Sequence, residues 1–146
     1  MTLEELTNLA YEFKKQKHPL VPEYALPKPK KFKDTTANEL TKAIVTYIRL
    51  TGNYADRINN MGVYDKKFNG YRKANTRKGI CDIMASKKIQ IQDREIAINV
   101  GIEVKIGKDK LSEHQLHMQD EITKSGGVYI IATNWDFFYN QWNQIK

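Results

Sequence analysis

The sequence predicts an α/β or α+β domain in which helices pack against a mixed β-sheet. Segments with apolar residues at helical spacing enclose a series of short apolar segments that are typical of strands. Their order is helix, several strands, helix, strand and helix, which favours a sheet covered by helices. At 146 residues the chain is long enough to bury the core of one such domain.

Residues 1–36 are expected to form an arm attached to a domain of residues 37–146. The apolar residues that recur at helical spacing in the arm are Leu3, Leu6, Leu9, Ala10 and Phe13. They predict an amphipathic helix at the start of the chain. Residues 18–33 hold all four prolines and predict an extended, basic linker. Because the apolar stripe must pack on something, a homodimer through this helix is one expectation.

The domain is expected to begin with a helix and a series of strands. Thr36 is a suitable cap for a helix over residues 37–50, which Gly52 would end. Two short strands are predicted at residues 53–59 and 63–68, followed by a loop to residue 78. The next strands are predicted at residues 80–85 and 89–92, joined by a turn at residues 86–88, and at residues 95–106.

The end of the chain is expected to alternate between helix and strand. Ser112 and Gln115 have the spacing of a capping box, at the start of a helix that Gly126 would end. Residues 128–133 predict a buried strand, and residues 134–145 predict an aromatic helix that closes the domain.

The charge of the chain favours a polyanionic partner. The chain has 24 Lys and Arg residues against 17 Asp and Glu, a net charge of +7 and a pI of about 9.4. DNA is the first expectation, and an anionic membrane surface is the second. The acidic N-terminal segment and the lack of a long apolar run predict a cytoplasmic protein without a membrane span. The single cysteine, Cys81, excludes an intrachain disulfide and a cysteine-rich zinc site.

Asp82 lies in the apolar segment ICDIMA, where both faces of a strand would be apolar. An ionised carboxylate in such a place is costly unless it pairs with a cation or binds a metal. The structural alternatives are a salt bridge to a nearby basic residue and a strand end that reaches water.

The segment NVGIEVKIG places Glu103 and Lys105 on one face of a predicted strand, together with Gly101. This alternation is equally typical of a half-solvated strand. In an active site, Gly101 and Gly107 would leave gaps on that face through which a DNA backbone could approach.

Asp82 and the strand of Glu103 together predict a metal site. Adjacent strands would bring Asp82 beside Glu103, with Lys105 one pleat away. The two carboxylates and the Val104 carbonyl are the hard oxygen ligands that Mg²⁺ prefers. Lys105 would then orient the attacking water for phosphodiester hydrolysis.

A larger set of residues has the order and spacing of a nuclease motif. Its members are Gly79 to Ile83, Gly101 to Lys105, and Leu111, Ser112 and Gln115. The combination resembles the VRR-Nuc branch of the PD-(D/E)xK nucleases. Glu39 in the predicted helix and Arg57 in the following strand also resemble that branch, and the resemblance covers about residues 38–136.

The resemblance implies a restriction-endonuclease-like core, a mixed sheet of four or five strands flanked by helices. It also implies a Mg²⁺-dependent DNA nuclease in which Mn²⁺ can substitute. Asp82 and Glu103 would bind the metal, with Glu39 completing its shell. Lys105 would position the attacking water, and Gln115 would reach the site from the following helix. Several members act on branched or flapped DNA, so we expect structure-selective cleavage.

Two of these positions have structural alternatives, and one departs from the family. Gln115 is also explained by the capping box with Ser112. Glu39 is also explained by the favourable position of an acidic residue near a helix N-terminus. Cys81 stands where the family often has proline or a small residue, and because cysteine is small we expect the site to remain active.

The predicted loop of residues 66–78 has six basic residues and no acidic one. It is either a solvated surface or a DNA contact, and charges of one sign repel each other unless a polyanion neutralises them. The expected DNA contacts, including the arginine from the resemblance, are Arg57, Lys66, Lys67, Arg72, Lys73, Arg77 and Lys78.

The sequence therefore predicts a Mg²⁺-dependent DNA endonuclease that leaves 5′-phosphate and 3′-hydroxyl ends. Two alternatives stay open. One is a non-catalytic, basic nucleic-acid-binding protein in which Asp82, Glu103 and Lys105 form a structural ion network. The other is a module that docks acidic proteins and shows no salt-sensitive DNA binding.

Overall fold

The computed structural model describes residues 1–58, 63–67, 69–72 and 77–146. The predicted DNA contact Lys73 lies outside the described residues. The helices are α1 (Leu3–Lys17), the 3₁₀ helix η1 (Glu23–Ala25), α2 (Ala37–Leu50), α3 (Glu113–Lys124) and α4 (Trp135–Gln144). The strands are β1 (Tyr54–Arg57), β2 (Val63–Asp65), β3 (Gly70–Arg72), β4 (Ile83–Ile91), β5 (Arg94–Val104) and β6 (Val128–Ala132). Within these ranges no helix is both long and apolar enough to span a lipid bilayer.

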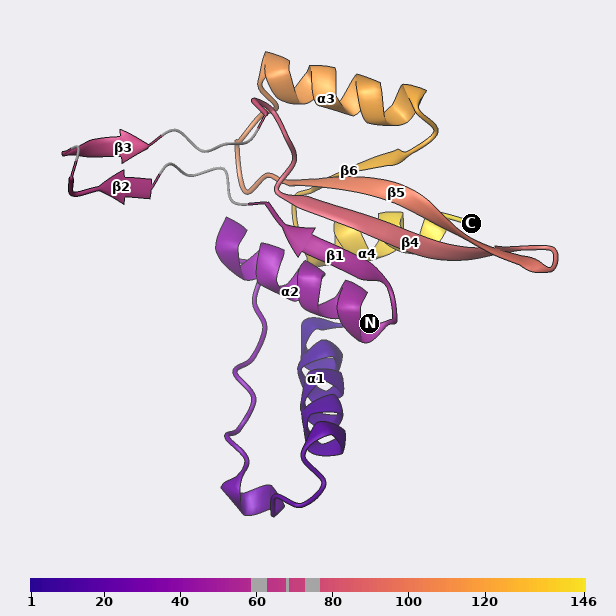
Figure 1. Ribbon diagram of the computed structural model, residues 1–146. Helices are drawn as coiled ribbons and strands as arrows, with labels where there is room; N and C mark the ends of the chain where they lie inside the picture. The colour runs from indigo at the N-terminus through magenta and orange to yellow at the C-terminus, as the bar shows by residue number, and fades with distance from the viewer. Residues whose placement is uncertain (59–62, 68, 73–76) are drawn as a thin grey trace.

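Four strands form a mixed sheet in the order β1-β4-β5-β6. β4 runs antiparallel to β1 and to β5, whereas β6 runs parallel to β5 because α3 carries the chain back along the sheet. α2 and α4 lie against one face of the sheet, and α3 lies against the other (Figure 1). The chain therefore has the mixed α/β architecture that the sequence predicts.

The predicted capping residues set the helix boundaries. The Thr36 hydroxyl accepts the N–H of Glu39 at 3.3 Å, and the Ser112 hydroxyl accepts the N–H of Gln115 at 3.3 Å. Two residues after α2, Gly52 takes a φ of 76°, in the left-handed region where glycine ends a helix without strain. The predicted bounds of α2 are confirmed.

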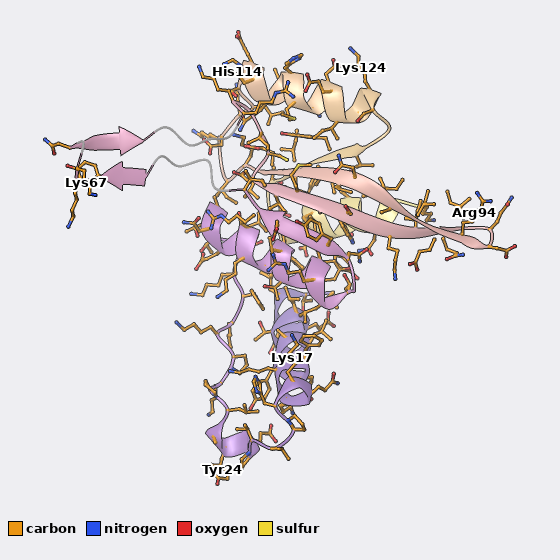
Figure 2. All side chains as sticks on the ribbon, in the orientation of Figure 1. Lys17, Tyr24, Lys67, Arg94, His114 and Lys124 are labelled. Carbon is orange, nitrogen blue, oxygen red and sulfur yellow. The ribbon has the colours of Figure 1, made fainter. Side chains whose placement is uncertain are left out.

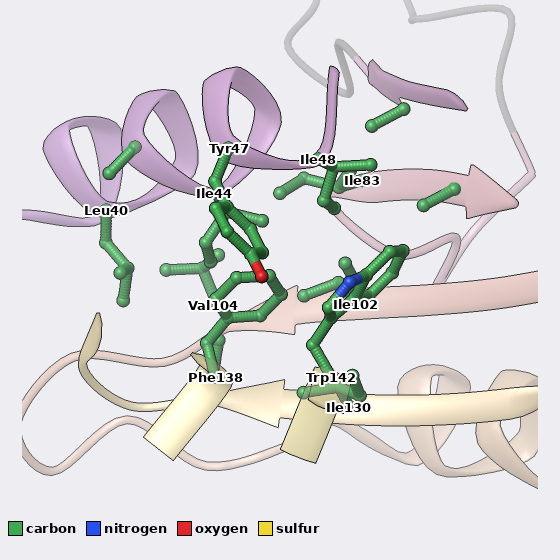
Figure 3. Packing of buried hydrophobic residues seen from close by; sticks show 14 of the residues in the cluster. Leu40, Ile44, Tyr47, Ile48, Ile83, Ile102, Val104, Ile130, Phe138 and Trp142 are labelled. Atoms are coloured by element: carbon green, nitrogen blue, oxygen red, sulfur yellow. The ribbon is translucent and has the colours of Figure 1, made fainter. Parts of the chain in front are cut away.

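The main core lies between the sheet and the helices α2 and α4 (Figure 3). Ile44 of α2, Ile102 of β5 and Phe138 of α4 are completely buried there. Tyr47 meets Trp135 edge to face, with 5.5 Å between the ring centroids. The closing helix is thus an aromatic layer of the core, as its sequence predicts.

The arm packs onto this core through its first residues and its last ones. The indole N–H of Trp135 donates to the Met1 carbonyl at 2.8 Å, and its backbone N–H donates to Asp34 Oδ2 at 3.0 Å. Leu6 of α1 is completely buried, whereas Phe13 is 41% exposed. Part of the apolar stripe of α1 therefore packs against the rest of the same chain. A homodimer through the part that remains exposed stays a prediction.

The turn predicted at residues 86–88 is wrong, because β4 continues through them. The chain reverses later, at Gln92 with a φ of 51°, and Arg94 lies near the far end of this long hairpin (Figure 2). The polar residues stay in the strand because they find distant partners. The Lys87 ammonium donates to the Ile145 carbonyl at 3.0 Å, just beyond the end of α4.

The predicted loop of residues 66–78 is partly a hairpin. β3 pairs antiparallel with β2, and Asn69 has a φ of 46° in the connection between them. This hairpin extends away from the sheet, with Lys67 near its tip (Figures 1 and 2).

Candidate metal centre

Asp82 is held by the ends of three strands. The antiparallel register of β4 and β5, continued by one residue, puts Asp82 opposite Glu103. The backbone N–H of Val104 donates to Asp82 Oδ2 at 2.9 Å. The carbonyl of Asp82 accepts the N–H of Ile58, just after β1, at 2.8 Å. The structure therefore brings the two predicted carboxylates together.

Glu103 is buried beneath α3 and is only 2% exposed. The face of β5 that carries it is not half-solvated, because a Cβ on Gly101 would lie 2.7 Å from Ile122 of α3 and 3.1 Å from Tyr129. Gly101 therefore allows the helix to pack closely on the strand. The expectation that a DNA backbone approaches at Gly101 is wrong, since protein atoms fill that space.

The Glu103 carboxylate has one well-bonded oxygen and one without a partner. Oε1 accepts from the Lys105 ammonium at 3.1 Å and from the amide Nε2 of Gln115. Oε2 is buried and accepts no hydrogen bond from any residue that the structure describes. Burial raises the pKa of Glu103, and the charge of Asp82 raises it further, against the lowering effects of Lys105 and of the Asp82 backbone N–H. Burial and the neighbouring carboxylate therefore outweigh the stabilising effect of Lys105 on the charged form of Glu103.

Gln115 serves the helix and the site at the same time. Its Oε1 accepts the N–H of Ser112 at 2.9 Å, which completes the capping box, while its Nε2 donates to Glu103.

The start of α3 also depends on Gly79, which has a φ of 78°. A Cβ at Gly79 would lie 2.3 Å from the carbonyl oxygen of His114, so only glycine allows this approach.

Tyr129 is a neighbour of Glu103 that the sequence analysis missed. β6 pairs Tyr129 with Gly101, and the tyrosine hydroxyl is buried with no hydrogen-bond partner in the described ranges. Burial raises the pKa of Tyr129, and the acidic groups of Glu103, Cys81 and Asp82 raise it further. Burial likewise raises the pKa of the Cys81 thiol to about 11. The available signal was a tyrosine inside an apolar strand, where a buried hydroxyl usually needs a partner.

Glu39 is not brought to the two carboxylates. Its side chain accepts from the hydroxyls of Thr35 and Thr36 at 2.5 and 3.1 Å. The bond from Thr35, and then the bond from Thr36, lower the pKa of Glu39. In the described part of the chain, no three His, Cys, Asp or Glu side chains gather closely enough to hold a metal ion. Glu39 therefore does not form a third ligand beside Asp82 and Glu103 in this structure.

The predicted DNA contacts are spread over the surface. Arg57 donates to Asn38 Oδ1 at 2.6 Å, at the N-terminal end of α2. Arg77 makes a two-point ion pair with Glu121 of α3 at 2.6 and 2.7 Å, so its charge is already neutralised. The predicted contacts with exposed side chains elsewhere are Lys66, Lys67 and Lys78.

Comparisons of the chain with protein-family models, curated proteins and solved structures find no match. What the site does is therefore inferred from its own residues.

Proposed function

We propose that the chain is a Mg²⁺-dependent DNA endonuclease of the PD-(D/E)xK type, similar to the VRR-Nuc branch. The observation that carries this proposal is the buried carboxylate of Glu103, which lies beside Asp82 and keeps one oxygen without a partner among the described residues. A purely structural ion network would be expected to satisfy both oxygens of a buried carboxylate. The mixed sheet with helices on both faces supports the restriction-endonuclease-like core that the proposal requires.

The residues present fit a hard divalent cation. An ion at the strand ends would meet two carboxylates, one of which has a buried oxygen without a hydrogen-bond partner among the described residues. Asp82, Glu103 and the Val104 carbonyl would hold the ion, and water and phosphate oxygens would complete its shell. The threonine contacts of Glu39 account for it as a helix-capping residue, so we leave it out of the ligand set.

The residues around Glu103 have complementary tasks in this reaction. When bound, Mg²⁺ would supply the positive charge that stabilises the scissile phosphate and the leaving oxygen. The Lys105 ammonium, held by Glu103 at 3.1 Å, orients the attacking water. Gln115 fixes the Glu103 carboxylate through its amide. The water oxygen bonds to phosphorus as the P–O3′ bond breaks, which leaves 5′-phosphate and 3′-hydroxyl ends.

A cleavage assay with and without metal tests the proposal. Supercoiled plasmid and flapped, forked or junction oligonucleotides are incubated with Mg²⁺, with Mn²⁺ or with EDTA. We expect cleavage with either metal, preference for the branched substrates, and no product in EDTA. Lys105→Ala should lose roughly a hundredfold in rate or more. Lys124→Ala, which changes an exposed lysine of α3 paired with Asp120, is the control and should cut normally. Equal product in Mg²⁺ and EDTA would contradict the proposal.

The second candidate is a non-catalytic nucleic-acid-binding protein on the same fold. The ion pair between Lys105 and Glu103 favours it, as does the absence of a third acidic ligand among the residues that the structure describes. This candidate predicts salt-sensitive DNA binding with no product under any metal. It also predicts that Asp82→Asn binds DNA with unchanged affinity in Mg²⁺.

A further inference from the structure

The arm and α2 enclose a groove whose charged lining is entirely basic among the described residues. We propose that this groove binds the phosphate backbone of double-stranded DNA and leads it toward the candidate metal centre. The choice of DNA as the partner rests on the function proposed above. The shape and charge of the groove are observed independently of that proposal.

The first part of the groove lies between α1, the linker and α2. Its charged lining residues are Lys14 of α1, Lys28 and Lys30 of the linker, and Lys42 of α2. Three segments that are separate in the sequence therefore present lysines to one hollow. α1 and the linker run side by side away from the sheet, and Tyr24 marks their far end (Figure 2).

The second part of the groove is a separate hollow that shares Lys42 with the first and is lined by α2 and β1. Its other charged lining residues are Arg49 and Arg57, and its polar lining includes Asn38 and Thr46. The α2 residues among these recur every three or four positions, so they share one face of the helix. Arginine, lysine, asparagine and threonine side chains are the usual donors to phosphate oxygens.

The lysines of this groove are not neutralised within the described ranges. Lys28, Lys30 and Lys42 form no ion pair with any residue that the structure describes. Arg49 is the exception, because it pairs with Asp56. Like charges held around one hollow repel each other, and a polyanion relieves that repulsion when it binds.

A neighbouring hollow on the arm, which shares Lys28 and Phe32 with the groove, has a mixed charged lining. This hollow is lined by Glu4 and Glu23 as well as by lysines. Lys15 of α1 is paired with Glu12 at 2.6 Å and with Glu23 at 3.4 Å. The charged residues that line the groove itself are all basic, whereas Glu4 and Glu23 line the adjoining hollow.

The groove is fixed before any ligand arrives. Besides the contacts of its first residues described above, the arm is tied internally by the Phe32 N–H, which donates to the Thr7 hydroxyl at 3.1 Å. Pro27 and Pro29 alternate with lysines in the linker and restrict its backbone. Binding to a fixed surface loses less conformational entropy than binding to a flexible tail.

The second part of the groove ends close to the candidate metal centre. Arg57 is the last residue of β1, and the next residue, Ile58, donates its N–H to the Asp82 carbonyl. A DNA backbone that follows the groove therefore arrives at the end of β1, next to the segment that carries Asp82. The arm would hold the duplex beside the cleavage point.

Salt-dependent DNA binding tests this proposal. A fluorescent duplex is titrated in EDTA, where no cleavage is expected, with a triple variant carrying Lys28→Ala, Lys30→Ala and Lys42→Ala. Each lost phosphate contact should reduce the slope of log affinity against log salt by about 0.9, so we expect a reduction of roughly 2–3 in slope. At low salt the affinity should fall by about tenfold or more.

The control is a second triple variant with the same loss of charge outside the groove. It carries Lys88→Ala, Lys124→Ala and Lys146→Ala, and the first two of these lysines are exposed and paired with Glu95 and Asp120. Its affinity should stay within about twofold of wild type. Circular dichroism melts check that both triple variants fold. Equal weakening of both variants, or of neither, would overturn the proposal, and so would equally good competition by polyglutamate or anionic vesicles.

The binding and cleavage assays separate this proposal from the proposed function. If the wild type binds DNA through the groove but makes no product, the nuclease proposal fails and the groove proposal stands. If the wild type cuts DNA while the groove variant keeps its affinity and salt slope, the groove proposal fails and the nuclease proposal stands.

Discussion

The two faces of β5 are both covered by helices, but they have opposite chemistry. The face toward α2 and α4 carries Val100, Ile102 and Val104, which are packed in the main core. The face toward α3 carries Gly101 and Glu103. On this side of the sheet, Glu103 Oε2 and the hydroxyl of Tyr129 in β6 are buried without hydrogen-bond partners in the described part of the chain. One strand thus separates a region that stabilises the fold from a region whose buried charge destabilises it.

This difference indicates which face of β5 stabilises the fold and which face carries a buried charge that does not. A buried carboxylate with a raised pKa disfavours folding, whereas the apolar side chains on the opposite face favour it. The following four predictions test that contrast, from the largest expected change in stability to the smallest.

Truncating a side chain on the apolar face of β5 should lower the free energy of unfolding more than any change on the polar face. Ile102→Ala should lower the free energy of unfolding by about 2–5 kcal/mol, because it leaves a cavity in the core. Urea denaturation measures the loss. Ile96→Ala, at a position of the same strand that is 38% exposed, is the control and should cost less than about 1 kcal/mol. Similar losses at the two positions would show that this face is not the main source of stability.

Metal should stabilise the polar face. At ten times its dissociation constant, Mg²⁺ should raise the free energy of unfolding by about 1.4 kcal/mol. For a chain of this size that corresponds to roughly 3–6 °C in melting temperature. The melt of Glu103→Gln should not respond. A rise of the same size in that variant, or in wild type with sodium chloride of equal ionic strength, would argue against a site at Glu103.

Neutralising Glu103 should make the metal-free protein more stable. Glu103→Gln keeps an oxygen that can accept from Lys105 and Gln115 but removes the charge that burial disfavours, so we expect a small gain in the free energy of unfolding, less than the effect of metal. The same variant should lose cleavage. Glu95→Gln, an exposed position of β5 paired with Lys88, should change stability by less than about 0.5 kcal/mol. A large loss of stability in Glu103→Gln would show that the charge is structural.

The smallest effect is a pH dependence. Because the pKa of Glu103 in the folded chain lies above its ordinary value of 4.5, the folded state binds this proton more tightly than the unfolded state. Wild type should therefore lose stability relative to Glu103→Gln as pH rises from about 4.5 through the folded pKa, and the penalty should be absent below that range. Urea titrations in EDTA measure the difference, and the opposite slope would contradict the interpretation that burial disfavours the ionised Glu103 carboxylate.

The parts of the fold that depend on local signals could be predicted from the sequence. Thr36 and Ser112 set the starts of α2 and α3 because a cap acts on the first turn of its own helix. Asp82 and Glu103 could be paired because their strands are consecutive in the sheet and antiparallel. The roles of these residues in catalysis stay predictions.

The parts that depend on distant partners could not be predicted. Alternation in β5 indicates two different faces, but it does not indicate that α3 covers the polar one. The residues around Lys87 suggest a turn, and their strand conformation is stabilised by a carbonyl near the end of the chain. Tyr129 reaches Glu103 only because the crossover through α3 fixes which strand lies beside β5.

The Gln115 side chain hydrogen-bonds both to the capping residue Ser112 and to Glu103. Access to the buried carboxylate therefore depends on whether the first turn of α3 stays formed. The first turn of a helix is where local opening needs the least free energy, far less than global unfolding. When this turn of α3 frays, the amide that closes the capping box releases Glu103 in the same event. Opening of this first turn would therefore expose the Glu103 carboxylate to water and ions without unfolding the rest of the core.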